Sequence, residues 1–305
     1  MTVDVLLPFY GDVAMMKQAV ESILGQTSPD WTLTVVDDGY PDDSVPGYFG
    51  VLTARDPRVT YLRNEQNLGA NGNYRKALTF VRHELAVVMG ADDVMLRNYV
   101  ETVVAAHKQF PSAQIIQPGV EVIDEHNQPS MGLVDRMKRV YSPRVGSSAG
   151  RRLLSGEPLA ISLIRGNWLY FPSICWKSDT LVAMGFREGL DVMQDLGLAL
   201  DLIKAGGGLV VDSSVCFQYR RHRESDSSWR ALDGTRFIEE REFFTQMADE
   251  LEAVGWRRAA RTARLHLSSR LNAATLLPRA WRTQQHQGVR NLREHVLARP
   301  GVSKR

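Results

Sequence analysis

Short apolar runs alternate with segments of helical periodicity over the first 120 residues. Five runs have the length of buried strands: residues 3–10, 33–39, 58–65, 84–90 and 113–119. Pro8 interrupts the first run, so we expect that strand to break there. Between the first two runs, apolar residues recur at helical spacing, and Asp12 is placed to cap that helix. Strands that alternate with helices predict an α/β fold with a mostly parallel sheet.

The rhythm is lost over residues 124–157, which are polar and contain scattered Pro, Gly and Ser. This composition predicts a long, mobile connection of the kind that is often functional inside a domain. A helix is predicted at 192–206, then two strands, "GLVVDSS" and "VCFQYRRH". From Thr235 onward the pattern is helical.

We therefore expect one domain over residues 1–230 and a C-terminal helical extension over 231–305. Within the domain, the sequence favours a first half of residues 1–120 and a second half of residues 121–230. The boundary between the halves coincides with the loss of the strand–helix alternation.

The composition is that of an ordinary globular protein, with 305 residues of which 44% are hydrophobic and 24% charged. Cys175 and Cys216 are too few and too far apart in sequence to define a disulfide framework, which favours a reducing compartment. We expect no signal peptide, because the first strand starts at Val3 with Asp4 inside it, and no spanning helix, because no apolar run is long enough. These features predict a cytoplasmic protein.

The net charge of +2 hides an asymmetry, since residues 251–305 carry twelve Lys or Arg against two Glu. Within this tail, residues 256–282 combine Arg with Leu at helical spacing, a pattern typical of helices on anionic membranes. Peripheral contact with the inner face of the cell membrane is one expectation. Packing on the domain itself or on a second copy, as a homodimer, is the alternative. Nucleic acid is disfavoured, because no binding motif accompanies the basic residues.

Two pairs of adjacent carboxylates follow predicted strands: Asp37 with Asp38, and Asp92 with Asp93. Adjacent carboxylates repel each other unless hydrogen-bond donors or a cation compensate. The carboxyl ends of parallel strands are where such sheets bind ligands, and a divalent cation on a nucleotide diphosphate takes hard oxygen ligands. The alternative for each pair is turn or helix-capping chemistry.

Several segments occur in an order and spacing that resembles family 2 glycosyltransferases: "VLLPFYGD", "QAVESILGQT", "TLTVVDDG", "NEQNLGANGNYRKAL" and "VVMGADDVM". The resemblance covers residues 3–110 and resumes at 191–228. It implies the GT-A fold and inverting transfer of a sugar from a nucleotide-diphospho-sugar, most often a UDP-sugar. It also implies Mn²⁺ or Mg²⁺, and as acceptor a hydroxyl of a growing glycan or glycolipid of the bacterial cell surface.

The same resemblance assigns the nucleotide site. Its implied members are Pro8, Phe9 and Tyr10 as a wall for the base, Asp38 with Asp37 in support, Asn67, Gly69 and Arg75. A flat aromatic face suits stacking against a base. Tyr74 and Arg75 stand where many members have Arg and Asn, so Arg75 takes over the base contact only as a substitute.

For the metal and the diphosphate, the resemblance points to two segments. Asp92 matches the last acid of the family's D-x-D motif, and Gly90 stands in place of the first acid. Asp93 and His222 are implied as further ligands, and Asp92 also faces the nucleotide. The cations expected to neutralise the leaving diphosphate are Arg220 and Arg221, with Arg223 beside them. Serines at 225, 227 and 228 suggest a lid.

Inversion needs a base that takes the proton from the acceptor hydroxyl. The resemblance implies Asp195 in this role, with Asp191 as the fallback and Gln194 on the acceptor side in place of the usual Glu. The aromatic cluster that includes Trp168 and Tyr170 is expected either to hold an acceptor sugar or to belong to the core.

Two other functions stay open from the sequence. Gly90 and Gln194 depart from the family pattern, which allows a nucleotide-sugar-binding or scaffold protein that is catalytically weak. A nucleotidyltransferase shares the α/β layout, but it normally has a Gly-rich loop with Lys or Arg after the first strand. The segment "PFYGDVAMM" contains no such loop.

Overall fold

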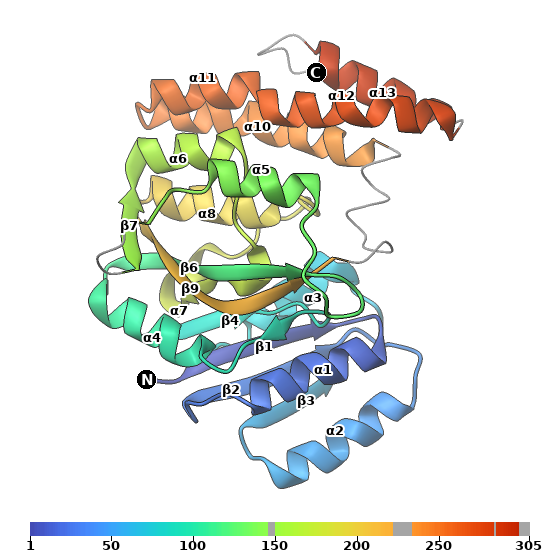
Figure 1. Cartoon of the computed structure of the whole chain (residues 1–305), viewed down its shortest axis with the longest axis vertical. Coiled ribbons are helices and arrows are strands. Elements are labelled where there is room, and N and C mark those ends of the chain that lie inside the picture. Colours follow the sequence, from blue (N-terminus) through green and yellow to red (C-terminus); the bar gives the residue numbers. More distant parts are fainter. Residues whose placement is uncertain (146–149, 222–233, 284, 299–305) are drawn as a thin grey trace.

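A nine-stranded sheet runs through the middle of the molecule with helices on both of its faces (Figure 1). The computed structural model describes residues 1–145, 150–221, 234–283 and 285–298. The strand order is β3-β2-β1-β4-β8-β6-β9-β5, and β7 pairs with β9 off this path. Strands β5, β7 and β8 run against the others, so the sheet is mostly parallel, as the sequence predicts.

The strands are β1 (Val3–Phe9), β2 (Trp31–Asp37), β3 (Val59–Arg63), β4 (Leu85–Val88), β5 (Val94–Met95), β6 (Ala113–Ile123), β7 (Arg151–Ser155), β8 (Cys175–Lys177) and β9 (Gly208–Arg220). The helices that pack on the sheet and between its strands are α1 (Val13–Leu24), α2 (Ser44–Arg55), α3 (Gly69–Leu78), α4 (Tyr99–Gln109), α5 (Leu133–Tyr141), α6 (Gly156–Arg165), α7 (Ser178–Met184) and α8 (Gln194–Lys204). The C-terminal helices are α10 (Thr235–Ala253), α11 (Arg257–Leu265), α12 (Leu267–Arg282) and α13 (His286–Leu297).

Strand β1 continues through Pro8, so the expected break there is wrong. In a parallel strand, alternate residues bond to opposite neighbours. The Phe9 carbonyl accepts from Asp38 on the β2 side, and the Leu6 carbonyl accepts from Met89 on the β4 side. Pro8 therefore faces the β4 side, beyond the end of β4, where its missing N–H removes no bond between paired strands. The predicted Asp12 cap is confirmed, since its carboxylate accepts from the Met15 N–H at 2.8 Å.

The predicted mobile connection over 124–157 is also wrong, because it contains α5 and β7. Helix α5 has apolar residues at helical spacing, but they are exposed, while its Asp135 is buried. The two strands expected at 208–222 form one continuous strand, β9. The register between β6 and β9 shifts around Gly119, and this irregularity lets β9 pass its polar Ser213–Ser214 segment without ending.

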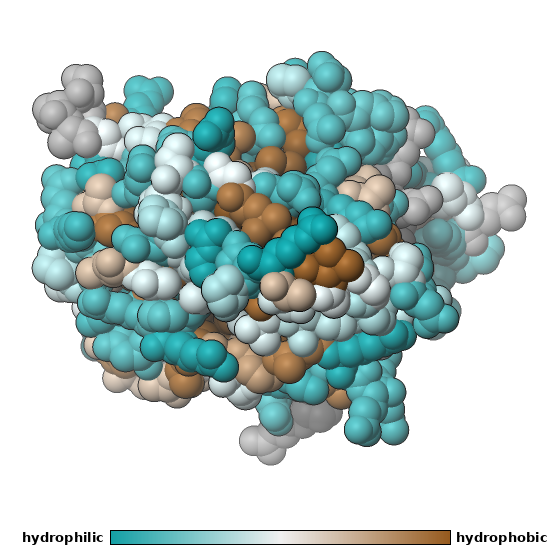
Figure 2. Space-filling model, turned by 90° about the horizontal axis from the view of Figure 1, so that it is seen from below, coloured by the Kyte–Doolittle hydropathy of each residue, from teal (hydrophilic) through white to brown (hydrophobic). Residues whose placement is uncertain are grey.

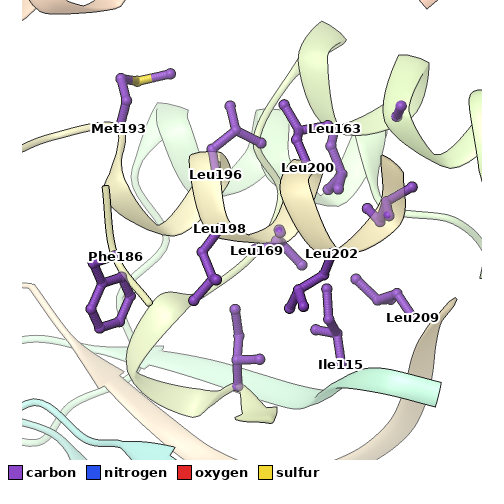
Figure 3. Close-up of a cluster of buried hydrophobic side chains, with 14 of the residues drawn as sticks. Ile115, Leu163, Leu169, Phe186, Met193, Leu196, Leu198, Leu200, Leu202 and Leu209 are labelled. Carbon is purple, nitrogen blue, oxygen red and sulfur yellow. The ribbon is translucent and has the colours of Figure 1, made fainter. Parts of the chain in front are cut away.

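Helix α8 lies at the centre of the larger hydrophobic core and is buried on nearly all sides. Figure 3 shows Leu198 and Leu202 pointing toward the sheet, where Ile115 and Leu209 lie. Leu196 and Leu200 point the other way, toward α6. The burial of α8 on nearly all sides fixes the position of its first turn, where Asp195 stands.

The first C-terminal helices continue this core, since α10 and α11 contribute Phe243, Met247 and Ala260 to it. Arg187 before α8 also pairs with Asp201 of α8 and with Glu250 of α10. Helices α12 and α13 close a smaller core around Phe237. Within the described ranges, no helix has the length and apolar character to cross a membrane.

The opposite face of the sheet is covered by α1, α2 and α4 over a second core. The molecule seen from below is mostly hydrophilic, with hydrophobic residues in patches interrupted by polar ones (Figure 2). This end of the molecule contains the strands at one edge of the sheet, β3, β2 and β1 (Figure 1).

The register shift between β6 and β9 can be tested at Gly119. A Cβ there would lie 2.8 Å from the Ser214 backbone, so we expect Gly119→Ala to lower the free energy of unfolding by roughly 2 kcal/mol. Gly50, exposed inside α2 with nothing within 4 Å of its Cβ position, is the control. Gly50→Ala should stabilise by about 0.5–1 kcal/mol. Urea unfolding curves check both, and equal effects of the two substitutions would contradict the register described here.

Candidate active site

The first carboxylate pair lies at the end of β2, where the protein's own donors satisfy both side chains. Asp37 accepts from the Tyr40 N–H at 2.8 Å and from the Tyr61 hydroxyl at 2.5 Å. Asp38 accepts from the Asn64 amide at 2.7 Å and from the Leu68 N–H at 2.9 Å. Donors therefore offset the repulsion between these two carboxylates. Asp38 ties the end of β2 to the loop that leads into α3.

That loop is held by asparagines. The Asn67 side chain accepts from the Gly69 N–H at 2.9 Å, and Gly69 has a φ of 72°, which requires glycine for the tight turn that the sequence predicts. Inside α3, Asn73 donates to the Val36 carbonyl at 2.8 Å. Arg75 lies one turn after Asn71 and donates to its side chain at 3.4 Å.

The predicted aromatic wall is divided between buried and exposed rings. Pro8 and Phe9 are buried in β1, whereas Tyr10 is 56% exposed at the strand's end. Tyr40, which sequence reasoning missed, lies 5.2 Å from the Phe9 ring and 5.3 Å from the Tyr10 ring. Tyr10 and Tyr40 are thus the rings of this wall that solvent or a ligand can reach.

The second carboxylate pair lies in the turn after β4 and folds back over Gly90. A Cβ at Gly90 would lie 2.5 Å from Asp93 Oδ2 and 2.9 Å from Asp92 Oδ1. The space that a first D-x-D acid would fill is therefore occupied by the carboxylates of the next two acids. Asp93 is buried, and its Oδ2 has no hydrogen-bond partner within the described structure.

Burial, and then the charge of Asp92, raise the pKa of Asp93 well above its usual range. A buried, unpartnered carboxylate oxygen beside a second carboxylate is a site that a cation would stabilise. The described residues hold no cluster of three or more His, Cys, Asp or Glu that could bind a metal alone. The donor set fits a Mg²⁺ or Mn²⁺ ion that keeps most of its ligands from a bound phosphate or water. The expected ligand His222 lies outside the described residues, as do Arg223 and the serines at 225, 227 and 228.

The guanidinium of Arg220 is buried under this turn and binds the protein itself. Its Nε donates to the Asp92 carbonyl at 2.6 Å, and its backbone N–H donates to Asp93 Oδ1 at 2.8 Å. Its remaining partners are the Asp124 carbonyl at 3.1 Å, Asn127 Oδ1 at 2.7 Å and Gln18 Oε1 at 3.1 Å. Arg220 thus braces the turn that carries the carboxylates.

Arg221 points to a different group, a buried carboxylate from α5. Its guanidinium donates to the two oxygens of Asp135 at 2.8 and 3.3 Å. The Tyr170 hydroxyl also donates to Asp135, at 3.2 Å. Tyr219 lies between these groups, with its ring 5.3 Å from that of Tyr170, and burial raises its pKa to about 12.

Asp195 is half-buried in the first turn of α8, and the Asn167 amide donates to its Oδ2 at 3.2 Å. Gln194 beside it is buried, and its Oε1 has no hydrogen-bond partner in the described structure. Asp191, the fallback base, is exposed. Trp168 is buried in the core and donates its indole N–H to Ser162, and it lines the same cavity as Tyr170.

Tyr74 connects the two halves of the site. Burial raises its pKa, and so do the charges of Asp92, Asp93 and Asp195. Because the interaction between charges falls with distance, carboxylates from the turn after β4 and from α8 lie near enough to the same tyrosine to act on its pKa. The two halves of the chain therefore bring their acidic residues to one site.

Lys138 of α5 borders the candidate site beside Tyr170. Its ammonium group donates to the Leu169 carbonyl and lies 4.2 Å from the centre of the Tyr170 ring. Burial lowers the pKa of Lys138 to about 8, although the charges of Asp195 and Asp135 act in the opposite direction. Beneath α5, a cavity of about 790 Å³ is lined by Lys138, Tyr170 and Trp168 together with residues of β6 and β9.

Sequence reasoning missed six side chains of this site: Tyr40, Tyr74, Asp135, Lys138, Asn167 and Tyr219. Two of them, Asp135 and Lys138, stand in the segment taken for a loop, where an acid and a lysine three residues apart gave no signal. Tyr74 was visible only as a departure from the family pattern, and its place beside three carboxylates follows from the fold.

The sequence model of "Glycosyl transferase family 2" matches residues 4–175, more than half of the chain. An uncharacterized protein of Mycobacterium tuberculosis (strain CDC 1551 / Oshkosh) is 25% identical over 252 residues, which cover 79% of this chain and 73% of that protein. The Escherichia coli enzyme named UDP-Glc:alpha-D-GlcNAc-diphosphoundecaprenol beta-1,3-glucosyltransferase WfgD is 30% identical over 99 residues. That match covers 32% of this chain and only 38% of the E. coli enzyme.

Solved structures of S. aureus TarS have a similar fold. TarS 1–349 in complex with UDP-GlcNAc has a TM-score of 0.58 at 12% identity, over 97% of this chain and 90% of that chain. The complex of the same protein with UDP gives the same values. The likeness confirms the GT-A type of α/β fold that the sequence predicts.

The buried ammonium of Lys138 gives a testable dependence of stability on pH. The pKa is about 8 when folded and 10.5 ordinarily, so between these values the unfolded chain binds more protons and stability rises with pH. Over this window, wild type should gain on the order of 2 kcal/mol relative to Lys138→Met. Lys17, which also lies over a tyrosine ring, is the control, and Lys17→Met should follow wild type. Denaturant curves across this pH range check the difference, and parallel curves for all three proteins would contradict the burial of the charge.

Proposed function

The chain belongs to glycosyl transferase family 2 and is a glycosyltransferase, and we propose that it moves a sugar from a nucleotide-diphospho-sugar to an acceptor hydroxyl with inversion. The proposal is supported by the nearness of Asp92, Asp93 and Asp195 to the buried Tyr74, since the charges of all three carboxylates raise the pKa of this tyrosine. In this proposal, the pair binds the cation and the diphosphate, and the third acid acts as the base. The two requirements of an inverting transfer therefore lie within one site.

The donor is a UDP-sugar in this proposal. TarS, which shares the fold, has been solved with UDP-GlcNAc and with UDP, and the E. coli relative is named for UDP-Glc. The uracil base of the donor would stack on the exposed Tyr10, with Tyr40 behind that ring. This position is next to the loop that Asp38, Asn67 and Gly69 hold in place. Arg75 lies on the helix that follows this loop, α3. In this proposal it is the cation that contacts the nucleotide base.

Asp92 and Asp93 would hold a Mn²⁺ or Mg²⁺ ion, which neutralises charge on the leaving diphosphate when bound. Asp93 would ionise fully only beside such a cation, because burial and Asp92 keep its pKa high otherwise. In this proposal, Arg220 acts through the turn that it braces, since its guanidinium is occupied by protein acceptors. Arg221 is the arginine nearer the acceptor side, paired with Asp135.

Asp195 would take the proton of the acceptor hydroxyl while that oxygen bonds to the anomeric carbon. The bond from this carbon to the phosphate oxygen breaks at the same time, and its electron pair leaves with the nucleotide diphosphate. Asn167 donates to Oδ2 and so leaves Oδ1 for the acceptor. The rigid α8 supports this geometry, because a base must be held at hydrogen-bond distance from the proton that it removes.

The acceptor would lie along Tyr170, with Gln194 and Trp168 beside it. A glycan or a lipid-linked glycan fits this proposal, since the name of the E. coli relative specifies a diphosphoundecaprenol-linked sugar. With such an acceptor, the proposal places the protein in bacterial cell-surface polysaccharide synthesis on the inner face of the membrane. Helix α12 exposes Leu267, Leu271 and Trp281, so the C-terminal helices stay candidates for peripheral membrane contact or for a homodimer.

A binding protein with little turnover is the second candidate, because Gly90 and Gln194 depart from the family pattern. The carboxylates that fill the space at Gly90 weaken this argument, since the acidic character of the turn is retained without the first acid. The third possibility, a nucleotidyltransferase, is disfavoured by the match to glycosyl transferase family 2.

Removal of the base separates these candidates. We expect Asp195→Asn to reduce sugar transfer by about 10²–10⁴-fold while the donor affinity stays within a few fold of wild type, because only proton removal is lost. Transfer is measured from UDP-sugars with Mn²⁺ present, and donor binding by the thermal shift that each UDP-sugar produces.

Asp191→Asn is the matched control and should retain transfer. Loss of transfer in Asp191→Asn but not in Asp195→Asn would move the base to the exposed acid. A wild-type protein that binds a donor in the thermal-shift panel and releases no UDP would favour the binding protein.

A further inference from the structure

Helix α5 is built inside out, with polar side chains toward the protein and apolar ones toward solvent. Leu133 and Val140 are 72% and 75% exposed, and Val134 and Met137 lie exposed on the same helix. Asp135, in contrast, is 2% exposed. An ordinary surface helix buries its apolar stripe, whereas this helix leaves its apolar face without a partner among the residues that the structure describes.

The inward face of α5 is fixed by polar contacts. Asp135 binds Arg221 and the Tyr170 hydroxyl, and Lys138 donates to the Leu169 carbonyl. These contacts set the rotation of the helix, because turning the apolar face inward would expose the salt bridge and bury four apolar side chains in its place. The outward apolar stripe is thus held by the same residues that border the candidate active site.

Exposed cations flank the stripe. Arg136 and Arg139 on α5 and Arg144 just after it are exposed, and the one acid between residues 131 and 145 is the buried Asp135. An apolar stripe beside arginines, with no exposed acid, has the character of a helix that lies in the interface of an anionic bilayer. Figure 1 shows α5 at the front of the molecule, with no other described helix in front of it.

We propose that α5 docks this protein on an anionic lipid bilayer, with Leu133, Met137 and Val140 in the headgroup region. A second copy of the chain fits this surface less well. A twofold pair of α5 helices would place Arg136 and Arg139 close to their own copies, and a single nine-residue helix offers little of the area that a stable dimer needs. The inference is independent of the sugar-transfer chemistry, and it assigns membrane contact to an element outside the C-terminal helices.

Docking through α5 has a consequence for the site. The helix covers the cavity of about 790 Å³ that Lys138 and Tyr170 line, so the bilayer would lie directly beside this opening. Met131 and Arg139, which also line the cavity, belong to the segment that would touch the lipid. An acceptor carried by a lipid would then approach from the surface to which the protein is bound.

Cosedimentation of the full chain with vesicles tests the proposal. Wild type should bind vesicles of equimolar phosphatidylglycerol and phosphatidylcholine, and the double variant Leu133→Gln with Val140→Gln should bind at least about tenfold more weakly. Arg136→Gln with Arg139→Gln should lose roughly fivefold per arginine on these vesicles. The positions are exposed, so thermal melting of each variant should match wild type and show that it is folded.

The control is Leu267→Gln with Leu271→Gln on α12, which removes an equally exposed apolar pair and should leave binding unchanged. Loss of binding in this control but not in the α5 variant would overturn the proposal in favour of the C-terminal helices. Absence of wild-type binding would also overturn it. So would light scattering that shows a dimer in solution which the α5 variant converts to monomer.

Discussion

One buried guanidinium holds the candidate site in shape. Arg220 ends β9, and its hydrogen bonds reach the turn after β4, the turn after β6 and helix α1. Gln18 of α1 and Asp124 of the turn after β6 are more than a hundred residues apart in sequence. The Arg220 side chain nevertheless fixes their relative positions. A buried cation that donates to several carbonyl and amide oxygens is stable only when those oxygens stay in place. The position of the Asp92–Asp93 turn therefore depends on the completion of β9.

The two acidic pairs deal with the same repulsion in different ways. Asp37 and Asp38 are compensated by tyrosine, asparagine and backbone donors, and they serve to join β2 to its loops. Asp93 keeps one buried oxygen that bonds to no described residue, and burial together with the charge of Asp92 raises its pKa. A protein tolerates such a group mainly where it has a use, and perturbed carboxylates gather at functional sites. We therefore assign the proposed metal and diphosphate chemistry to the second pair.

The alternation of apolar runs and helices was sufficient to predict the fold, the order of the first strands and the acidic strand ends. The helix cap at Asp12 and the tight turn at Gly69 could be predicted, because capping and a positive φ depend on a few neighbouring residues. The sequence did not predict in which direction a side chain at the end of a strand points. Arg220 was expected on the diphosphate, but it donates to protein acceptors, because its orientation depends on where α1 and the turn after β6 pack. Helix α5 was missed, since its exposed apolar stripe and buried charges reverse the usual pattern.

The central claim is that Asp92 and Asp195 act on one bound donor from its two sides. A crystal structure with a UDP-sugar and Mn²⁺, with anomalous scattering to locate the metal, tests it most directly. The account predicts a manganese peak at the Asp92 and Asp93 carboxylates and the sugar ring between that peak and Asp195. A manganese peak remote from this turn, or a sugar whose anomeric carbon faces away from Asp195, would contradict it.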